Sequence, residues 1–173
     1  MEIVMEDQEL LEYCKSNFIY LKNEGRLIRK FSRGGAKAGC EAGNINDQGY
    51  RLVYIKGRCY RTHRLIYLLE YGYLPEFIDH INQDRLDNRI TNLRASTKSQ
   101  NLYNRGATTK NTSGYKGVVY CKQTGKWRAV IYQNGKRHCL GRYNLKHDAA
   151  SAYNEAALEY HGEFACLNEV RYA

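Results

Sequence analysis

"IDHINQDRLDNRITNLRASTKSQNLYN", residues 78–104, is the stretch that decides how this chain folds and what it can do. It contains one histidine, His80, directly after Asp79, and five asparagines. Loops use asparagine to form turns, but a turn does not need an aspartate and a histidine side by side. The pair therefore points to chemistry, and the rest of the chain must indicate which.

Hydrolysis of a phosphodiester bond would use each of these residue types. A water must lose a proton as it attacks phosphorus, and a histidine with a pKa near its ordinary value of about 6.5 is the usual base. A divalent cation stabilises the leaving oxygen, and Mg²⁺ takes oxygen ligands while keeping several waters. The residues that we expect in these roles are His80 as the base, Asp79 and Asn101 as metal ligands, and Asn92 as the residue that orients His80.

Each of these residues also has a plainer interpretation. Asp79 and His80 could cap a turn, and a lone asparagine is more often a turn or cap residue than a ligand. Four further polar residues of the stretch are expected to build turns only: Asn82, Asp84, Asp87 and Asn88.

Composition favours a nucleic-acid partner. The chain has 173 residues, a length that suffices for one ordinary domain or two small ones. Its net charge is +9 and its pI is about 9.2. A basic chain of this size points first to a nucleic-acid partner and second to an acidic membrane surface. No stretch approaches the ~20 apolar residues of a membrane span. The first fourteen residues are acidic and lack Lys and Arg, so we expect neither a secretory signal nor a membrane partner.

The six cysteines do not suggest a disulfide framework or a structural zinc site. No C-x-x-C pair occurs and the spacings are long and irregular, whereas structural zinc uses closely spaced ligand pairs. We expect free thiols in a reducing compartment.

The first half of the chain predicts a helix, a set of strands and a second helix. Residues 3–16 indicate a short acidic helix, and residues 17–60 indicate strands and turns. A glycine-rich hairpin within them carries Arg33 and Lys37 and lacks the G-K-[ST] ending of a phosphate-binding loop. "THRLIYLLEYGYLP" has helical spacing, with Pro75 as the stop signal. Residues 105–114 indicate a linker.

The last third carries nine Lys and Arg residues between Thr108 and His147, without one Asp or Glu. "KGVVYCK", "KWRAVIYQ" and "KRHCLGRY" predict three strands joined by turns at "QTG" and "NG". Alternation puts the side chain of Trp127 on one face of the middle strand and that of Arg128 on the other. A helix follows, with Asn144 as the expected N-cap. Ordinary surfaces mix both signs of charge, so we favour nucleic-acid binding by the Arg128 face over a merely solvated surface.

The central stretch resembles the H-N-H homing endonucleases of bacteriophages. "HRLIYLLEYGYLP" and then "IDHINQDRLDNRITNLRASTKSQNLYN" hold D-H, N-L-R and a final Asn in the order and spacing of that family. The resemblance implies a ββα-metal finger with one divalent ion, Mg²⁺ or Mn²⁺. Asp79 and Asn101 fall on its metal positions, His80 on the general base and Asn92 on the orienting residue. His63 matches a recurrent family position, for which we expect a structural or phosphate-contacting role.

The tail resembles a second family, the DNA-binding domain of the plant APETALA and ethylene-response factors, over residues 113–168. The resemblance implies a three-stranded sheet that enters the DNA major groove. Val119, Val130 and Cys139 depart from the usual contact residues, so the target sequence of the plant proteins does not carry over. Across the whole chain, the residues that we expect to contact DNA are Arg33, Lys37, His63, Arg64, Lys116, Lys126, Arg128, Tyr132, Lys136 and Arg137.

Together these features predict an α+β protein in four parts. They are an N-terminal helix and basic hairpin module over residues 1–48, an H-N-H domain over 49–105, a linker over 106–114 and an APETALA-like domain over 115–168. We expect a phage endonuclease that acts as a monomer on duplex DNA in the host cytoplasm, leaving a 5′ phosphate and a 3′ hydroxyl. The alternatives are a non-catalytic DNA-binding regulator and a protein that binds or cuts RNA.

Overall fold

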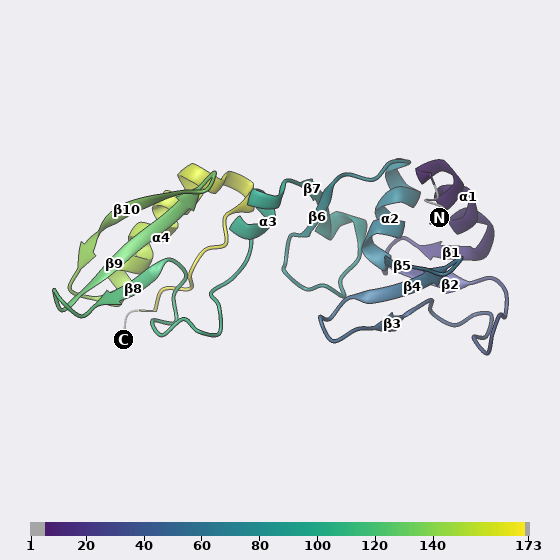
Figure 1. Cartoon of the computed structure of the whole chain (residues 1–173), viewed down its shortest axis with the longest axis horizontal. Helices are drawn as coiled ribbons and strands as arrows, with labels where there is room; N and C mark the ends of the chain where they lie inside the picture. Colours follow the sequence, from purple (N-terminus) through teal and green to yellow (C-terminus); the bar gives the residue numbers. More distant parts are fainter. Residues whose placement is uncertain (1–5, 172–173) are drawn as a thin grey trace. The chain divides into compact units, whose positions relative to one another are not determined.

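The structure is a computed structural model that describes residues 6–171 and mixes helices with small antiparallel sheets. It divides into two compact units, Met1–Ser96 and Thr97–Ala173 (Figure 1). Among the described residues, no helix has the length and apolar character to cross a membrane. All six cysteines are free thiols.

The first unit follows the expected order of helix, strands, helix and strands. Its elements are α1 (Asp7–Asn17), β1 (Phe18–Leu21), β2 (Arg26–Arg29), β3 (Asn44–Ile45), β4 (Arg51–Ile55), β5 (Arg58–Arg61), α2 (Thr62–Tyr71), β6 (Phe77–His80), the 3-10 turn η1 (Ile90–Asn92) and β7 (Leu93–Ser96). Three antiparallel sheets result: the pair β1–β2, the three-stranded β3–β4–β5 and the pair β6–β7. The start of the helix expected over 3–16 lies outside the described residues.

One hydrophobic core holds this unit together and places β6. Leu65, Ile66 and Leu68 of α2 are fully buried, together with Val53 and Ile55 of β4. Burial of such side chains contributes about 1.5–3 kcal/mol each. The helix is therefore fixed against the sheet, and the strand that follows it starts from a defined position.

The helix α2 ends earlier than the sequence suggested. Gly72 takes the left-handed conformation, with φ of 77°, and its N–H donates to the carbonyl of Leu68 at 2.8 Å. Glycine adopts this conformation without a Cβ penalty and so closes helices. The expectation that Pro75 is the stop signal was wrong, because Gly72 ends the helix first.

The second unit contains the expected three strands and helix. After α3 (Lys98–Tyr103) come β8 (Val118–Cys121), β9 (Lys126–Gln133), β10 (Lys136–Tyr143), α4 (Lys146–His161) and the 3-10 turn η2 (Gly162–Phe164). The antiparallel sheet has the order β10–β9–β8, and α4 packs across it (Figure 1). Ala129 and Ile131 of β9 are buried against alanines and Tyr153 of α4, which confirms the predicted inner face.

One local detail of this unit differs from the prediction, and a second concerns how α3 packs. The N-cap position of α4 is Leu145, without a side-chain cap bond, so the expectation of Asn144 as N-cap was wrong by one residue. The helix α3, which the prediction included in the nuclease segment, packs within the second unit. The Tyr103 ring stacks on His161 with centroids 3.8 Å apart, and its hydroxyl accepts from the Asn134 N–H at 2.8 Å.

Candidate active site

Strand β6 brings Asp79 and His80 to the site on opposite sides of its backbone. Successive residues of a strand alternate in direction, and the two side chains accordingly have different partners. Asp79 lies opposite Arg94 in the β6–β7 register. The Nε and Nη2 of Arg94 donate to Asp79 Oδ2 at 2.9 and 2.8 Å. The carboxylate is thus buried and held by a charge-assisted pair of bonds.

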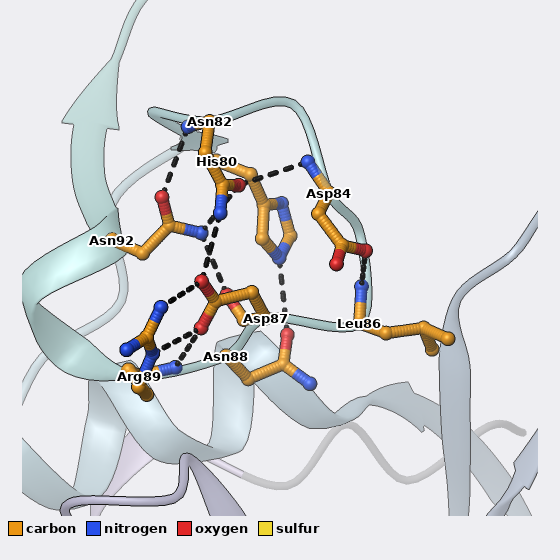
Figure 2. Close-up of polar contacts among 8 residues, drawn as sticks. All are labelled: His80, Asn82, Asp84, Leu86, Asp87, Asn88, Arg89 and Asn92. Carbon is orange, nitrogen blue, oxygen red and sulfur yellow. Dashed lines mark hydrogen bonds and ion pairs between the residues drawn. The ribbon is translucent and has the colours of Figure 1, made fainter.

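His80 is buried, with 5% of its surface exposed, and its Nε2 lies 3.0 Å from Asn88 Oδ1 (Figure 2). An amide oxygen can only accept a hydrogen bond, so Nε2 carries the proton and Nδ1 is the basic nitrogen. Burial lowers the pKa of His80, although the Asn88 bond and the carboxylates Asp79, Asp84 and Asp87 act to raise it. The ring is therefore neutral at pH 7 and ready to accept a proton.

The loop that follows His80 is built by short polar bonds. The oxygen Asn82 Oδ1 accepts from the Asp84 N–H at 2.9 Å, and Asp84 Oδ1 accepts from the Leu86 N–H at 2.9 Å. Asp87 forms an ion pair with Arg89 at 2.6 Å, which lowers the pKa of Asp87 to about 2. These contacts, drawn in Figure 2, confirm the turn-building roles predicted for Asn82, Asp84 and Asp87.

The structure gives Asn88 a contact with His80 that was not expected, and it shows which loop contacts Asn92 makes. Asn88 was expected to build a turn only, but it is 3% exposed and supplies the bond to His80. The Nδ2 of Asn92 donates to Asn82 Oδ1 at 2.9 Å and to the Asp87 carbonyl at 2.8 Å. Asn92 thus closes the loop that carries Asn88, and its assignment as the residue that orients His80 stays a prediction.

The β1–β2 turn packs against the loop that carries Asn88. A Cβ added to Gly25 would lie 2.2 Å from the Arg89 N and 2.3 Å from the Asn88 carbonyl carbon. The backbone of this turn therefore touches the backbone that presents Asn88. Gly25 has a φ of 65°, so both conformation and space demand glycine here. Sequence reasoning had no signal for this contact, because it joins segments far apart in the chain.

His63 of α2 packs against the base. The rings of His63 and His80 lie edge to face with centroids 4.8 Å apart, and Tyr50 lies 5.5 Å from His63 and 6.2 Å from His80. His63 is 4% exposed. Burial first, and then the nearby His80, Arg61 and Arg64, lower the pKa of His63 to about 2. Its ring is neutral and buried, which fits the structural role among those expected for it.

The other predicted DNA contacts of the first unit differ in exposure. Arg33 and Lys37 are exposed on the segment after β2, where Arg33 and Ala36 form an isolated bridge. Arg64 is half-buried, and its Nη1 donates to the Glu76 carbonyl at 3.2 Å. Arg33 and Lys37 are thus available to an external partner, whereas Arg64 is partly engaged.

In the second unit, most of the predicted contacts lie along β9 and β10. Lys126, Tyr132, Lys136 and Arg137 are exposed, and Tyr132 lies opposite Arg137 in the strand register.

Arg128 is half-buried beside its register partners Val119 and Arg142. Lys116 instead donates from Nζ to the Tyr103 carbonyl, and burial lowers the pKa of Lys116. Its use as a DNA contact stays a prediction, although its ammonium group is already bonded within the unit.

The metal site also stays a prediction. Asn101 lies on α3 in the second unit and is half-buried, while Asp79 belongs to the first. The described residues contain no group of three His, Cys, Asp or Glu residues placed to hold a metal ion. The predicted set is of another kind, one carboxylate and one amide oxygen, and these are donors that Mg²⁺ takes while keeping its waters.

Two segments of the chain match known protein families. Residues 60–103 match the family model of HNH endonucleases, and residues 113–163 match that of the AP2 domain. The chain thus contains a segment similar to HNH endonucleases and, after it, a segment similar to the AP2 domain. The β6–η1–β7 segment with Asp79 and His80 lies inside the first match, and the three-stranded sheet with α4 makes up the second.

One curated relative supports the same assignment. It is an uncharacterized HNH endonuclease of Acanthamoeba polyphaga mimivirus, 31% identical over 129 residues, which are 73% of this chain and 66% of the relative. The chain thus spans just under two thirds of that protein's length. No solved structure matches the chain significantly. The expected phage origin stays a prediction.

Proposed function

We propose that this chain is a metal-dependent endonuclease that hydrolyses a phosphodiester bond of duplex DNA. The observation that carries the proposal is the buried His80, held by Asn88 on a strand that also presents Asp79, inside a segment that matches HNH endonucleases. The AP2 segment indicates DNA binding, and its exposed basic face on β9 and β10 supports a role in gripping the duplex.

In the proposed reaction, His80 Nδ1 removes the proton from a water as the water oxygen attacks phosphorus. The bond from phosphorus to the 3′ oxygen breaks, and the released 3′ oxygen takes a proton from solvent, which leaves a 5′ phosphate and a 3′ hydroxyl. Neutral His80 suits this role because it is the unprotonated form that accepts the proton. The hydrogen bond to Asn88 fixes the tautomer in which Nδ1 is basic.

Asp79 and Asn101 would hold one divalent cation, Mg²⁺ or Mn²⁺. When bound, such an ion stabilises negative charge on the leaving oxygen. Within the chain, Arg94 fixes the Asp79 carboxylate through Oδ2. Asp79 and His80 are successive residues of β6, so their side chains lie on opposite sides of the strand. With one such site per chain, we propose that a monomer cuts one strand at a time, in the cytoplasm of the infected host.

The chemistry of the product tests the proposal. A nicked circular DNA from this reaction carries a 3′ hydroxyl and a 5′ phosphate, and DNA ligase should reseal it. His80→Ala should keep the affinity for DNA and lose nicking. A non-catalytic regulator would bind DNA equally in both forms and nick with neither, whereas a ribonuclease would cut RNA in preference to duplex DNA.

A further inference from the structure

Tyr50 is placed beside the active site by a tight turn. The turn between β3 and β4 is closed by Asn46, whose Oδ1 accepts from the N–H groups of Gln48 at 3.1 Å and Tyr50 at 2.8 Å. The Tyr50 ring is half-buried and lies within 6.2 Å of the His80 ring, centroid to centroid. The position of Tyr50 is therefore set by the short β3–β4 turn that Asn46 closes.

Two guanidinium groups pack on this ring. Arg61, the last residue of β5, has its Cζ 4.4 Å from the Tyr50 centroid, and Arg85 of the loop after β6 has its Cζ 4.9 Å away. Arg85 is held further by a bond from Nη1 to the Gln48 carbonyl at 2.6 Å. A guanidinium over an aromatic face is stabilised by the ring and keeps its N–H edge available.

These two arginines have no acidic partner among the described residues, although both are exposed. Other arginines of the same unit do have one: Arg51 pairs with Glu41 at 3.0 Å, Arg89 with Asp87 and Arg94 with Asp79. Within the described part of the chain, Arg61 and Arg85 thus place two positive charges without an acidic partner next to one tyrosine beside His80. Two like charges held together without a counter-charge favour binding of an anion.

We infer that Arg61 and Arg85, positioned by Tyr50, bind the phosphate that is attacked by the water His80 deprotonates, and the adjacent phosphate of the same strand. This inference rests on the proposed endonuclease function and names further catalytic residues for it. Arginine matches phosphate geometry through two parallel N–H bonds. The pair would hold the phosphate beside the base and stabilise the charge that builds on it as the water attacks.

The test uses the full-length chain with Arg61→Gln, Arg85→Gln, Tyr50→Leu and Tyr50→Phe. Binding to a short mixed-sequence duplex is measured in EDTA at several salt concentrations, and nicking of supercoiled plasmid is measured in Mg²⁺ at saturating enzyme. The control is Lys22→Gln, which removes an exposed positive charge from the β1–β2 turn, where Lys22 pairs with Glu70. Circular dichroism verifies that each variant is folded.

Each arginine variant should reduce the slope of log affinity against log salt by about 0.9, the value for one lost phosphate contact. It should also slow nicking by about 100-fold at saturation. Tyr50→Leu should slow nicking, and Tyr50→Phe should restore it because the ring remains. The control should nick at the wild-type rate.

Three outcomes would overturn the inference. An unchanged salt slope in both arginine variants would show that neither contacts a phosphate. A reduced slope with wild-type nicking at saturation would place the contact away from the reaction, and an equal rate loss in Lys22→Gln would attribute the effect to general charge. Failure of the wild type to nick any DNA would refute the proposed function and the attack on a bound phosphate, while the salt slope would still decide the phosphate contact.

Discussion

Replacing Asn88 should alter catalysis in a direction that depends on the replacement. In the structure its Oδ1 lies 3.0 Å from His80 Nε2, and its side chain is buried at 3% exposure. Losing a buried hydrogen bond of this kind costs about 1–3 kcal/mol. If that cost falls on the transition state, Asn88→Ala should slow nicking by about 5- to 150-fold, with little change in DNA affinity.

The pH profile gives the sharper readout. The Asn88 bond raises the pKa of His80 against the lowering effect of burial. Its removal in Asn88→Ala should therefore lower the pKa further, and the acid limb of the nicking rate should move to lower pH. Asn88→Asp would place a carboxylate on the ring and favour the imidazolium, so its acid limb should move to higher pH.

The assay is single-turnover nicking of supercoiled DNA between pH 5 and 9, with the three proteins at saturating concentration. DNA binding in EDTA serves as the control for folding and affinity. Shifts of both variants in the same direction, or acid limbs that coincide with the wild type, would refute the reasoning that Asn88 holds His80.

Three further predictions concern stability. Burial lowers the pKa of His63 to about 2, so the stability that its neutral form gives the first unit is complete above pH 6.5 and is lost as pH falls. By pH 5 the free energy of unfolding, measured by hydrogen exchange of that unit, should fall by about 2 kcal/mol. His63→Gln should flatten this pH dependence. Gly25→Ala should destabilise the protein by about 3 kcal/mol in chemical denaturation, since its Cβ would meet backbone; Gly35→Ala, with φ of 82° and nothing within 4 Å, should cost about 1 kcal/mol. Gly117→Ala should destabilise the second unit, monitored by the fluorescence of its single tryptophan, because the Cβ would lie 2.1 Å from the Tyr153 ring.

Local patterns predicted the framework of the site well. Alternation along an extended segment was enough to place Asp79 and His80 on opposite sides of β6, and the same rule identified the inner face of β9 with Ala129 and Ile131. These predictions succeeded because they depend on the period of a strand and on burial, both of which are written in neighbouring residues.

The sequence could not predict contacts between distant segments. Nothing in the chemistry of five asparagines indicates that Asn88 bonds His80, because this contact depends on how the loop closes. The support by Gly25, the ring of Tyr50 beside His80 and the stacking of Tyr103 on His161 each join residues that are far apart in the chain. Such contacts depend on tertiary packing.

The central claim is that His80 acts as the base in metal-dependent cleavage of DNA. Its most direct test is the conversion of supercoiled DNA to open circle by the full-length chain in Mg²⁺ and in EDTA, with His80→Ala measured beside the wild type. The account predicts nicking by the wild type in Mg²⁺ alone and a loss of at least about 100-fold in the variant, with DNA binding retained. Equal nicking by both proteins, or none by the wild type on DNA that it binds, would contradict it.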